Sequence, residues 1–322
     1  MQVRRMFLTV IFFAALTPGC LFRPALDLTT AENVTGAAEV SNPTSYLAYL
    51  TLPALMELAV GSGNCPTIVD ASTATTTDVR VTGGCTDADG VTHSGSMQYV
   101  DDGVKTTSTY EGYKQEGPED CDTGSVDVSL YLDGSITSEA VSAVATDYDV
   151  SLTTISYMPN DACDVMRVKV VSDYLFTATY SGADTDLDGV PDELYTYDGN
   201  GSFFMRDTLN DPKRVGSWDV ELNGFQYSTI DELSDGSGGD CTEPVAGEMV
   251  LSAGKHTATL IPDASTNCTD AVCTGWSLDG AVQSSEICGA VSGCGQTGSQ
   301  QLLWLVIPLI LLRRRRLAAT SS

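Results

Sequence analysis

Histidine is scarce in this 322-residue chain, which contains only two. His93 lies in the segment Val-Thr-His-Ser-Gly and His256 in Gly-Lys-His-Thr, and both segments are typical of strands and turns. Neither is accompanied by a nucleophile elbow or by zinc-ligand spacing, and no Cys-x-x-Cys pair occurs. The sequence therefore offers no support for histidine-based catalysis or a zinc centre, and we expect packing or surface roles for both histidines.

Basic residues are also few, with 16 Lys and Arg against 43 Asp and Glu. Six of the basic residues lie in two terminal segments that contain no acidic residue, so only ten face all 43 acidic residues in the part between. Binding to nucleic acid or to anionic lipid headgroups needs clustered Lys and Arg. The composition argues against both partners and predicts a soluble, acidic protein that attracts divalent cations.

Long apolar runs occur only near the two ends of the chain. The C-terminal run, Leu302 to Leu312, would span about 17 Å as a helix, whereas a bilayer core is about 30 Å thick. Pro308 weakens this helix further, and Arg313 to Arg316 follow it as a cationic stop. We expect a membrane segment that is held briefly and then cut, with a plain single-pass anchor as the alternative.

The order of features from Ser292 to Arg316 resembles a known bacterial sorting signal. A cysteine among small residues, Cys294, precedes a polar spacer, the apolar run and the arginines. This arrangement is similar to the myxobacterial (MYXO-CTERM) type of C-terminal tail. The resemblance implies an exported protein in the cell envelope or on the surface of a Gram-negative bacterium, with the membrane and the export and sorting machinery as partners. It implies processing near Cys294 and says nothing of chemistry.

The N-terminus supports export. Arg4 and Arg5 precede an apolar stretch over residues 6–16, which is the layout of a secretory signal peptide over residues 1–20. Gly19 before Cys20 resembles a lipoprotein box, although the expected leucine stands one position too early, at Leu16. Cys20 is therefore either lipidated, or it is lost or left unpaired after ordinary signal-peptide cleavage nearby.

Eight cysteines remain once Cys20 and Cys294 are assigned to lipidation or processing. An even number in an exported chain predicts disulfide bonds, and eight cysteines allow 105 pairings. We expect four disulfides: one between Cys65 and Cys85, one between Cys121 and Cys163, and two among the last four. Those four are Cys241, Cys268, Cys273 and Cys288.

The hydrophobic pattern between the two ends predicts an all-β fold. Apolar and polar residues alternate over residues 125–132, which is the period of a half-buried strand. Similar segments recur, and Asp-Gly or Asn-Gly pairs between them are typical of hairpin turns. The predicted turns are Asp133-Gly134, Asp198-Gly199, Asn223-Gly224 and Asp279-Gly280. We therefore expect an antiparallel meander that forms a sandwich or a barrel.

Composition divides the chain further. We expect a linker at 21–42, a main β domain at 43–233 with one helix at about 44–60, a flexible joint at 234–240 and a sorting tail at 292–322. The helix is apolar and should pack on one face of the sheet, and Pro53 should kink or split it. Residues 241–290 hold four cysteines and predict a small disulfide-stapled β module.

One motif points to a cation. Its candidate calcium ligands are Asp184, Asp186, Asp188, the carbonyl of Val190, and Asp192, with Gly189 at the sharp turn. The segment resembles the calcium loops of EF-hands, dockerins and thrombospondin type 3 repeats. Tyr195 stands where a bidentate carboxylate closes such loops, so the affinity should be weak. The alternative is an Asp-rich connection between two strands.

These observations favour a non-enzymatic β protein of the cell envelope, structural or ligand-binding, with calcium as a stabiliser. The alternative is a secreted hydrolase with an acidic active site. Carboxylate pairs can be drawn anywhere among 43 acidic residues, so no catalytic residue is singled out. An outer-membrane barrel fits the cysteines and the charge less well. No organic cofactor and no specific ligand is indicated.

Overall fold

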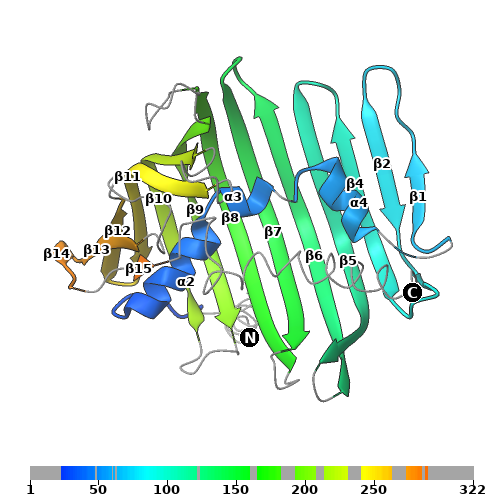
Figure 1. The fold of residues 1–322 in the computed structure, drawn as a ribbon, viewed down its shortest axis with the longest axis horizontal. Coiled ribbons are helices and arrows are strands. Elements are labelled where there is room, and N and C mark those ends of the chain that lie inside the picture. Colours follow the sequence, from blue (N-terminus) through cyan, green and yellow to red (C-terminus); the bar gives the residue numbers. More distant parts are fainter. Residues whose placement is uncertain are drawn as a thin grey trace, which may run out of the picture.

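The structure is a computed structural model that describes residues 23–47, 49–59, 61, 64–121, 124–159, 165–182, 193–207, 214–230, 241–262, 273–284 and 287–288. Its fifteen described strands belong to one antiparallel sheet in which nearly every strand pairs with its neighbour in sequence (Figure 1). The exceptions are β2, which pairs with β4 and not with β3, and β15, which pairs with β13. The strands are β1 (Thr67–Asp70), β2 (Thr77–Thr82), β3 (Cys85–Thr86), β4 (Thr92–Asp101), β5 (Lys105–Cys121), β6 (Gly124–Ala140), β7 (Ala145–Pro159), β8 (Val165–Ser181), β9 (Glu193–Asp207), β10 (Val215–Ile230), β11 (Cys241–Ala253), β12 (His256–Ile261), β13 (Cys273–Leu278), β14 (Ala281–Val282) and β15 (Ile287–Cys288).

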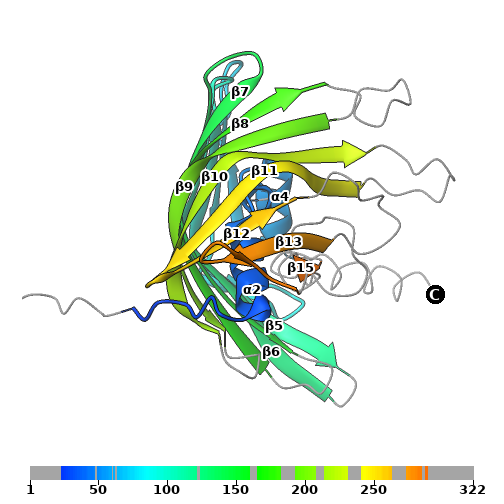
Figure 2. The ribbon, with the colours of Figure 1, turned by 90° about the vertical axis from the view of Figure 1, so that its left-hand side faces the viewer.

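The predicted antiparallel meander is confirmed, but the predicted sandwich or barrel is not what the described residues form. The path runs from β1 at one edge to β14 at the other, and these two strands do not pair with each other. The sheet bends into an open half-pipe (Figure 2). The strands β11 to β14, expected in a separate small module, continue the same sheet because β11 pairs with β10 over ten register partners.

The two faces of the sheet differ because side chains alternate along each strand. In β8, Tyr174 and Phe176 are buried on the concave face, whereas Asp173 and Leu175 are exposed on the convex face. The same alternation in β10 buries Trp218 and exposes Asp219. The hydrophobic core therefore lies on the concave side, between the sheet and three N-terminal helices (Figure 2).

The first of these helices, α2 (Ala31–Ser41), lies where the sequence predicted a linker. The hydroxyl of Thr30 caps it by accepting a 3.3 Å hydrogen bond from the backbone N–H of Asn33. Its buried residues are mostly small, among them Gly36, Ala37 and Ala38. A stripe of small residues resembles linker composition in a sequence, but it lets a helix approach a sheet closely.

The helix predicted at about 44–60 is split in two, as Pro53 suggested. The described parts are α3 (Thr44–Leu47) and α4 (Leu52–Leu58). Pro53 lies in the first turn of α4, where its missing N–H costs no hydrogen bond. The expected packing on the sheet is confirmed, because Leu55 and Leu58 belong to the core.

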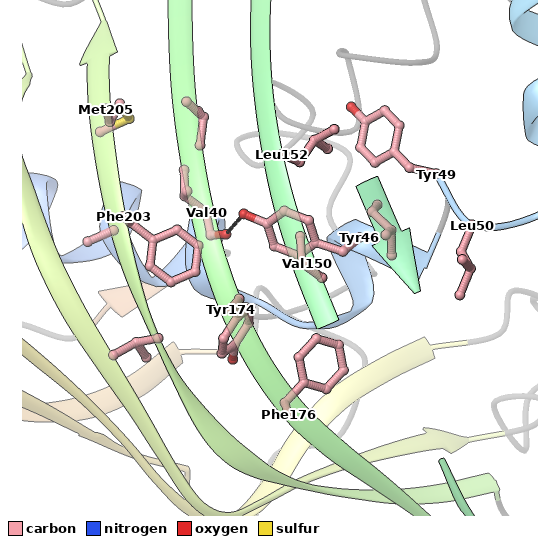
Figure 3. Packing of buried hydrophobic residues seen from close by; sticks show 14 of the residues in the cluster. Val40, Tyr46, Tyr49, Leu50, Val150, Leu152, Tyr174, Phe176, Phe203 and Met205 are labelled. Atoms are coloured by element: carbon pink, nitrogen blue, oxygen red, sulfur yellow. Dashed lines mark hydrogen bonds between the residues drawn. The ribbon is translucent and has the colours of Figure 1, made fainter. Parts of the chain in front are cut away.

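Polar side chains of the sheet hold these helices by hydrogen bonds to backbone and hydroxyl groups. Tyr46 of α3 donates to the carbonyl oxygen of Val40 at 2.9 Å (Figure 3). Its hydroxyl also lies 2.8 Å from the Ser172 hydroxyl of β8. From the sheet, the hydroxyls of Tyr110 and Tyr113 donate to the carbonyls of Tyr49 and Leu58. The indole N–H of Trp218 donates to the Ser41 hydroxyl at 2.9 Å. The helices thus cross the sheet in reverse strand order (Figure 1).

Three of the four predicted hairpin turns are wrong, because the residues lie inside strands. In two of the three, the Asp side chain accepts a hydrogen bond from a β-bulge of the neighbouring strand. In β6, Asp133 Oδ1 accepts a 3.0 Å bond from the N–H of Gly112, at a register shift of β5. In β9, Asp198 Oδ1 accepts a 2.7 Å bond from the N–H of Gly224, at a register shift of β10.

The fourth predicted turn, Asp279-Gly280, does join β13 to β14. Gly224 is the second residue of the predicted Asn223-Gly224 turn, and it lies inside a strand with φ +56°. A β-bulge bends its strand, so the two braced bulges contribute to the curvature of the half-pipe.

The disulfide between Cys65 and Cys85 is confirmed. Cys121 is also disulfide-bonded, while its expected partner Cys163 lies outside the described residues. The signal peptide with Cys20, the joint at 234–240, Cys268, and the tail with Cys294 likewise lie outside them. No described helix is both long enough and apolar enough to cross a bilayer.

Candidate functional site

A groove on the convex face of β8 to β11 is the strongest candidate for a binding site. It is open to solvent, on the side of the sheet opposite the helices, and its lining contains four carboxylates and no basic residue. Leu175, which is 54% exposed, and Val250 supply an apolar strip beside these charges. The four carboxylates belong to Asp173, Asp198, Asp219 and Glu221, and the polar side chains of Asn200 and Ser202 lie among them in the lining.

The strand register arranges these residues in rows. One row crosses four strands through Asp173, Ser202, Asp219 and Ser252, and the next crosses them through Leu175, Asn200, Glu221 and Val250. Neighbouring strands are about 4.8 Å apart, so Asp173 and Asp219 are separated by about 10 Å. Asp219 and Glu221 follow each other on one face of β10, about 7 Å apart.

These separations decide which cations the groove can hold. The ligands of one metal ion must all lie about 2.0–2.6 Å from it, so carboxylates about 7–10 Å apart cannot share an ion through their side chains without rearrangement. Within the described ranges, no three His, Cys, Asp or Glu side chains are grouped so as to hold a metal. The groove instead suits a ligand that carries several positive charges at intervals of about 7 Å.

The charges of the convex face are unevenly distributed along these strands. One carboxylate oxygen of Asp198, Oδ1, already accepts a hydrogen bond from the Gly224 N–H. Lys169 and Arg206 oppose each other farther along β8 and β9, on the same face as Asp173 and Ser202. A cationic ligand is therefore attracted toward the middle of the face and repelled from this end.

The two histidines lie away from the groove. His93 is fully buried, and its Nδ1 lies 3.0 Å from the Tyr113 hydroxyl, while its Nε2 lies 4.0 Å from Asp87 Oδ2. This hydroxyl, imidazole and carboxylate series resembles a catalytic relay in composition. However, the Tyr113 hydroxyl is buried and donates its proton to the Leu58 carbonyl at 2.7 Å, so it is not presented to a substrate.

Burial lowers the pKa of His93, and the nearby Asp87 carboxylate opposes this effect only in part. The imidazole is therefore neutral in the folded core at neutral pH. The predicted packing role for His93 agrees with this position.

His256 is the first residue of β12, directly after the turn from β11, and its Nδ1 is 2.8 Å from Asp279 Oδ2. The other oxygen of Asp279 accepts the Thr257 N–H at 2.9 Å. The hydrogen bond from His256 and then that from Thr257 lower the pKa of the Asp279 carboxyl. Because Asp279 has a positive φ of 51°, these bonds brace a tight turn and leave no free acid–base pair.

The calcium motif lies outside the described residues, in the connection between β8 and β9. The structure places its flanks: β8 and β9 remain paired up to Ser181 and Leu194. The groove was not singled out from the sequence. The sequence contains one sign of it, because Asp219 and Glu221 alternate with the buried Trp218 and Val220. The rows that these residues form with neighbouring strands can be recognised only once the strand order is known.

No family model, no curated protein and no solved structure matches this chain.

Proposed function

We propose that this protein is a non-enzymatic binding module of the bacterial cell envelope and that the convex groove holds an extended cationic chain. The proposal is carried by one observation: the rows of carboxylates on β8 to β11 are open to solvent, and the groove that they line contains no basic residue. The concave face is unsuited to the same role because the three helices and the core fill it.

The spacing favours an extended peptide. In an extended chain, alternate side chains point the same way and repeat about every 7 Å, which matches Asp219 and Glu221. A peptide with Lys at alternate positions can therefore place successive ammonium groups over successive carboxylates of β10. The polar groups of Asn200 and Ser202 and the apolar strip at Leu175 lie beside this track.

Attachment to the envelope is part of the same proposal and rests on the terminal segments. The signal peptide over residues 1–20 would export the chain, with Cys20 as a lipidation site, and the tail over residues 292–322 would hold it in the inner membrane before processing near Cys294. Fractionation of the parent bacterium, with mass analysis of both mature ends, tests this part independently of the groove.

Binding of a lysine-serine alternating peptide, measured by calorimetry, tests the groove. We expect Asp219→Asn with Glu221→Gln to weaken binding about fivefold, because two exposed charge contacts contribute roughly 1 kcal/mol together. The control Asp127→Asn with Glu139→Gln removes the same charge from β6, outside the groove lining, and should change affinity much less. Equal losses in both pairs would show non-specific attraction and would contradict the proposal.

A further inference from the structure

The last described strand brings two cysteines together in the backbone register. Cys273 begins β13 and Cys288 ends β15, and the two residues are direct antiparallel partners. Directly opposed Cα atoms of antiparallel strands lie about 4.5–5.5 Å apart, and a disulfide joins Cα atoms about 4.4–6.8 Å apart. The Cys65–Cys85 bond of this chain has a Cα separation of 5.8 Å, close to that range of opposed strands.

We propose that Cys273 and Cys288 form a disulfide that fastens β15 to β13. Cys65 is already bonded to Cys85, and Cys121 is also in a disulfide. A bond between Cys273 and Cys288 therefore leaves only Cys121, Cys163, Cys241 and Cys268 to be paired. If Cys121 is bonded to Cys163 as the sequence predicts, Cys241 and Cys268 are left to each other. The inference therefore selects one connectivity out of the 105 that eight cysteines allow.

The bond would fix the place from which the C-terminal tail departs. β15 is the last described element, and it lies against α2 as well as β13 (Figure 2). A strand of two residues has few ladder hydrogen bonds to hold it. A covalent link to β13 would keep β15 beside α2 even when the membrane tail pulls on it.

Forming the bond removes two protons and two electrons from the two thiols and joins their sulfur atoms. A protein disulfide of the exporting compartment accepts both electrons and protons and becomes a dithiol. Only the source of the oxidant rests on the proposed export. The pairing itself rests on the register and can be tested with a different oxidant.

The test is a disulfide map of the full-length protein, refolded in a glutathione redox buffer and digested without reduction by a protease that cuts before aspartate. Cuts before residues 240, 263, 270 and 279 place the last four cysteines of the set of eight in four different peptides. We expect the peptide 270–278 to be linked to the peptide that begins at residue 279. A link from 270–278 to 240–262 or to 263–269, or a free thiol at Cys273, would overturn the proposal.

The same map on protein recovered from cells separates the two proposals. If the link forms in glutathione but not in cells, the pairing stands and export to an oxidising compartment fails. Single variants give a second measurement. Cys288→Ser should make Cys273 reactive toward a maleimide, whereas Cys294→Ser should leave it unreactive. The Cys65–Cys85 peptide link reports in both variants that the sheet has folded.

Discussion

The backbone N–H of Gly112 in β5 donates a 3.0 Å hydrogen bond to Asp133 Oδ1 in β6, across a bulge. The N–H of Gly224 makes the equivalent bond with Asp198 in β9. Asp133→Ala and Asp198→Ala should each lower the free energy of unfolding by about 0.5–1.5 kcal/mol. β6 and β9 are about 14 Å apart in the sheet, so the two losses should add in the double variant.

Urea denaturation measures these losses. The Asn variants keep a side-chain oxygen acceptor and serve as controls, so they should retain most of the stability. If Asn and Ala variants lose stability equally, the bulge bonds do not stabilise the sheet.

The Tyr113 hydroxyl links the sheet to α4. Tyr113→Phe would leave the carbonyl of Leu58 without its 2.7 Å bond and Nδ1 of buried His93 without its partner. We expect a loss of about 1–3 kcal/mol in the free energy of unfolding. Tyr131→Phe is the matched control, because the Tyr131 hydroxyl makes no hydrogen bond to another described residue and should be nearly neutral. Equal effects of the two substitutions would contradict this role of the hydroxyl.

His93 should make stability depend on pH. Its pKa is lowered by burial from the ordinary 6.5, so the folded state favours the neutral imidazole. This contribution is fully present above about pH 6.5 and is lost as the pH falls toward the pKa in the folded state. The advantage of the wild type over His93→Gln should therefore be larger at about pH 8 than at about pH 5. Urea melts at both pH values measure the difference, and a constant advantage would refute the prediction.

Glu39 in α2 should act in the opposite direction. Burial raises the pKa of its carboxyl to about 7 from 4.5, and Arg214 opposes the effect. Because the folded state favours the protonated acid, this contribution is fully present below pH 4.5 and is lost as the pH rises through about 7. Glu39→Gln should therefore stabilise the protein by about 2–3 kcal/mol near pH 8.5 and much less near pH 5.

Thermal melts over this pH range test the Glu39 prediction. Glu32→Gln is the control on the same helix, since Glu32 accepts a 3.0 Å bond from Arg214. It should lower stability slightly instead of raising it. A stabilisation by Glu39→Gln that does not change with pH would show that the carboxyl is not the cause.

Calcium should raise the melting temperature if the loop between β8 and β9 holds it. At ten times the Kd, the bound ion adds about 1.4 kcal/mol to the free energy of unfolding. Asp186→Ala should abolish this increase. Asp149→Ala should not, because it replaces an exposed acidic residue of β7 that lies outside the motif. The same increase in both variants would remove the loop as the site.

The sequence predicted the strands well where burial alternates with exposure. Val128, Leu130 and Leu132 are buried in β6 as their period of two indicates. The prediction failed at Asp133-Gly134 because an Asp-Gly pair that favours a hairpin turn can also lie inside a strand and hydrogen-bond to a β-bulge of the neighbouring strand. Only knowledge of the neighbouring strand distinguishes a turn from a position beside a bulge. The Cys65–Cys85 bond was predictable because its residues are close in the chain.

The linker predicted at 21–42 failed for a different reason. The helix α2 packs through Gly36, Ala37 and Ala38, and small residues produce no apolar stripe that a sequence pattern would reveal. The groove was invisible because its rows join residues of four strands. Such rows depend on strand order and register, which single-strand patterns do not contain.

The reverse crossing of the helices implies an order of assembly. The bonds of Tyr113 with Leu58 and of Tyr110 with Tyr49 close loops of 55 and 61 residues. The bond between Tyr46 and Ser172 closes one of 126 residues, and that between Trp218 and Ser41 closes one of 177. Closure costs more entropy as the loop grows, and the partner strands of the longer loops come later in the chain. A chain exported from its N-terminus would therefore seat α4 first, α3 next and α2 last, covering the concave face as each strand is added.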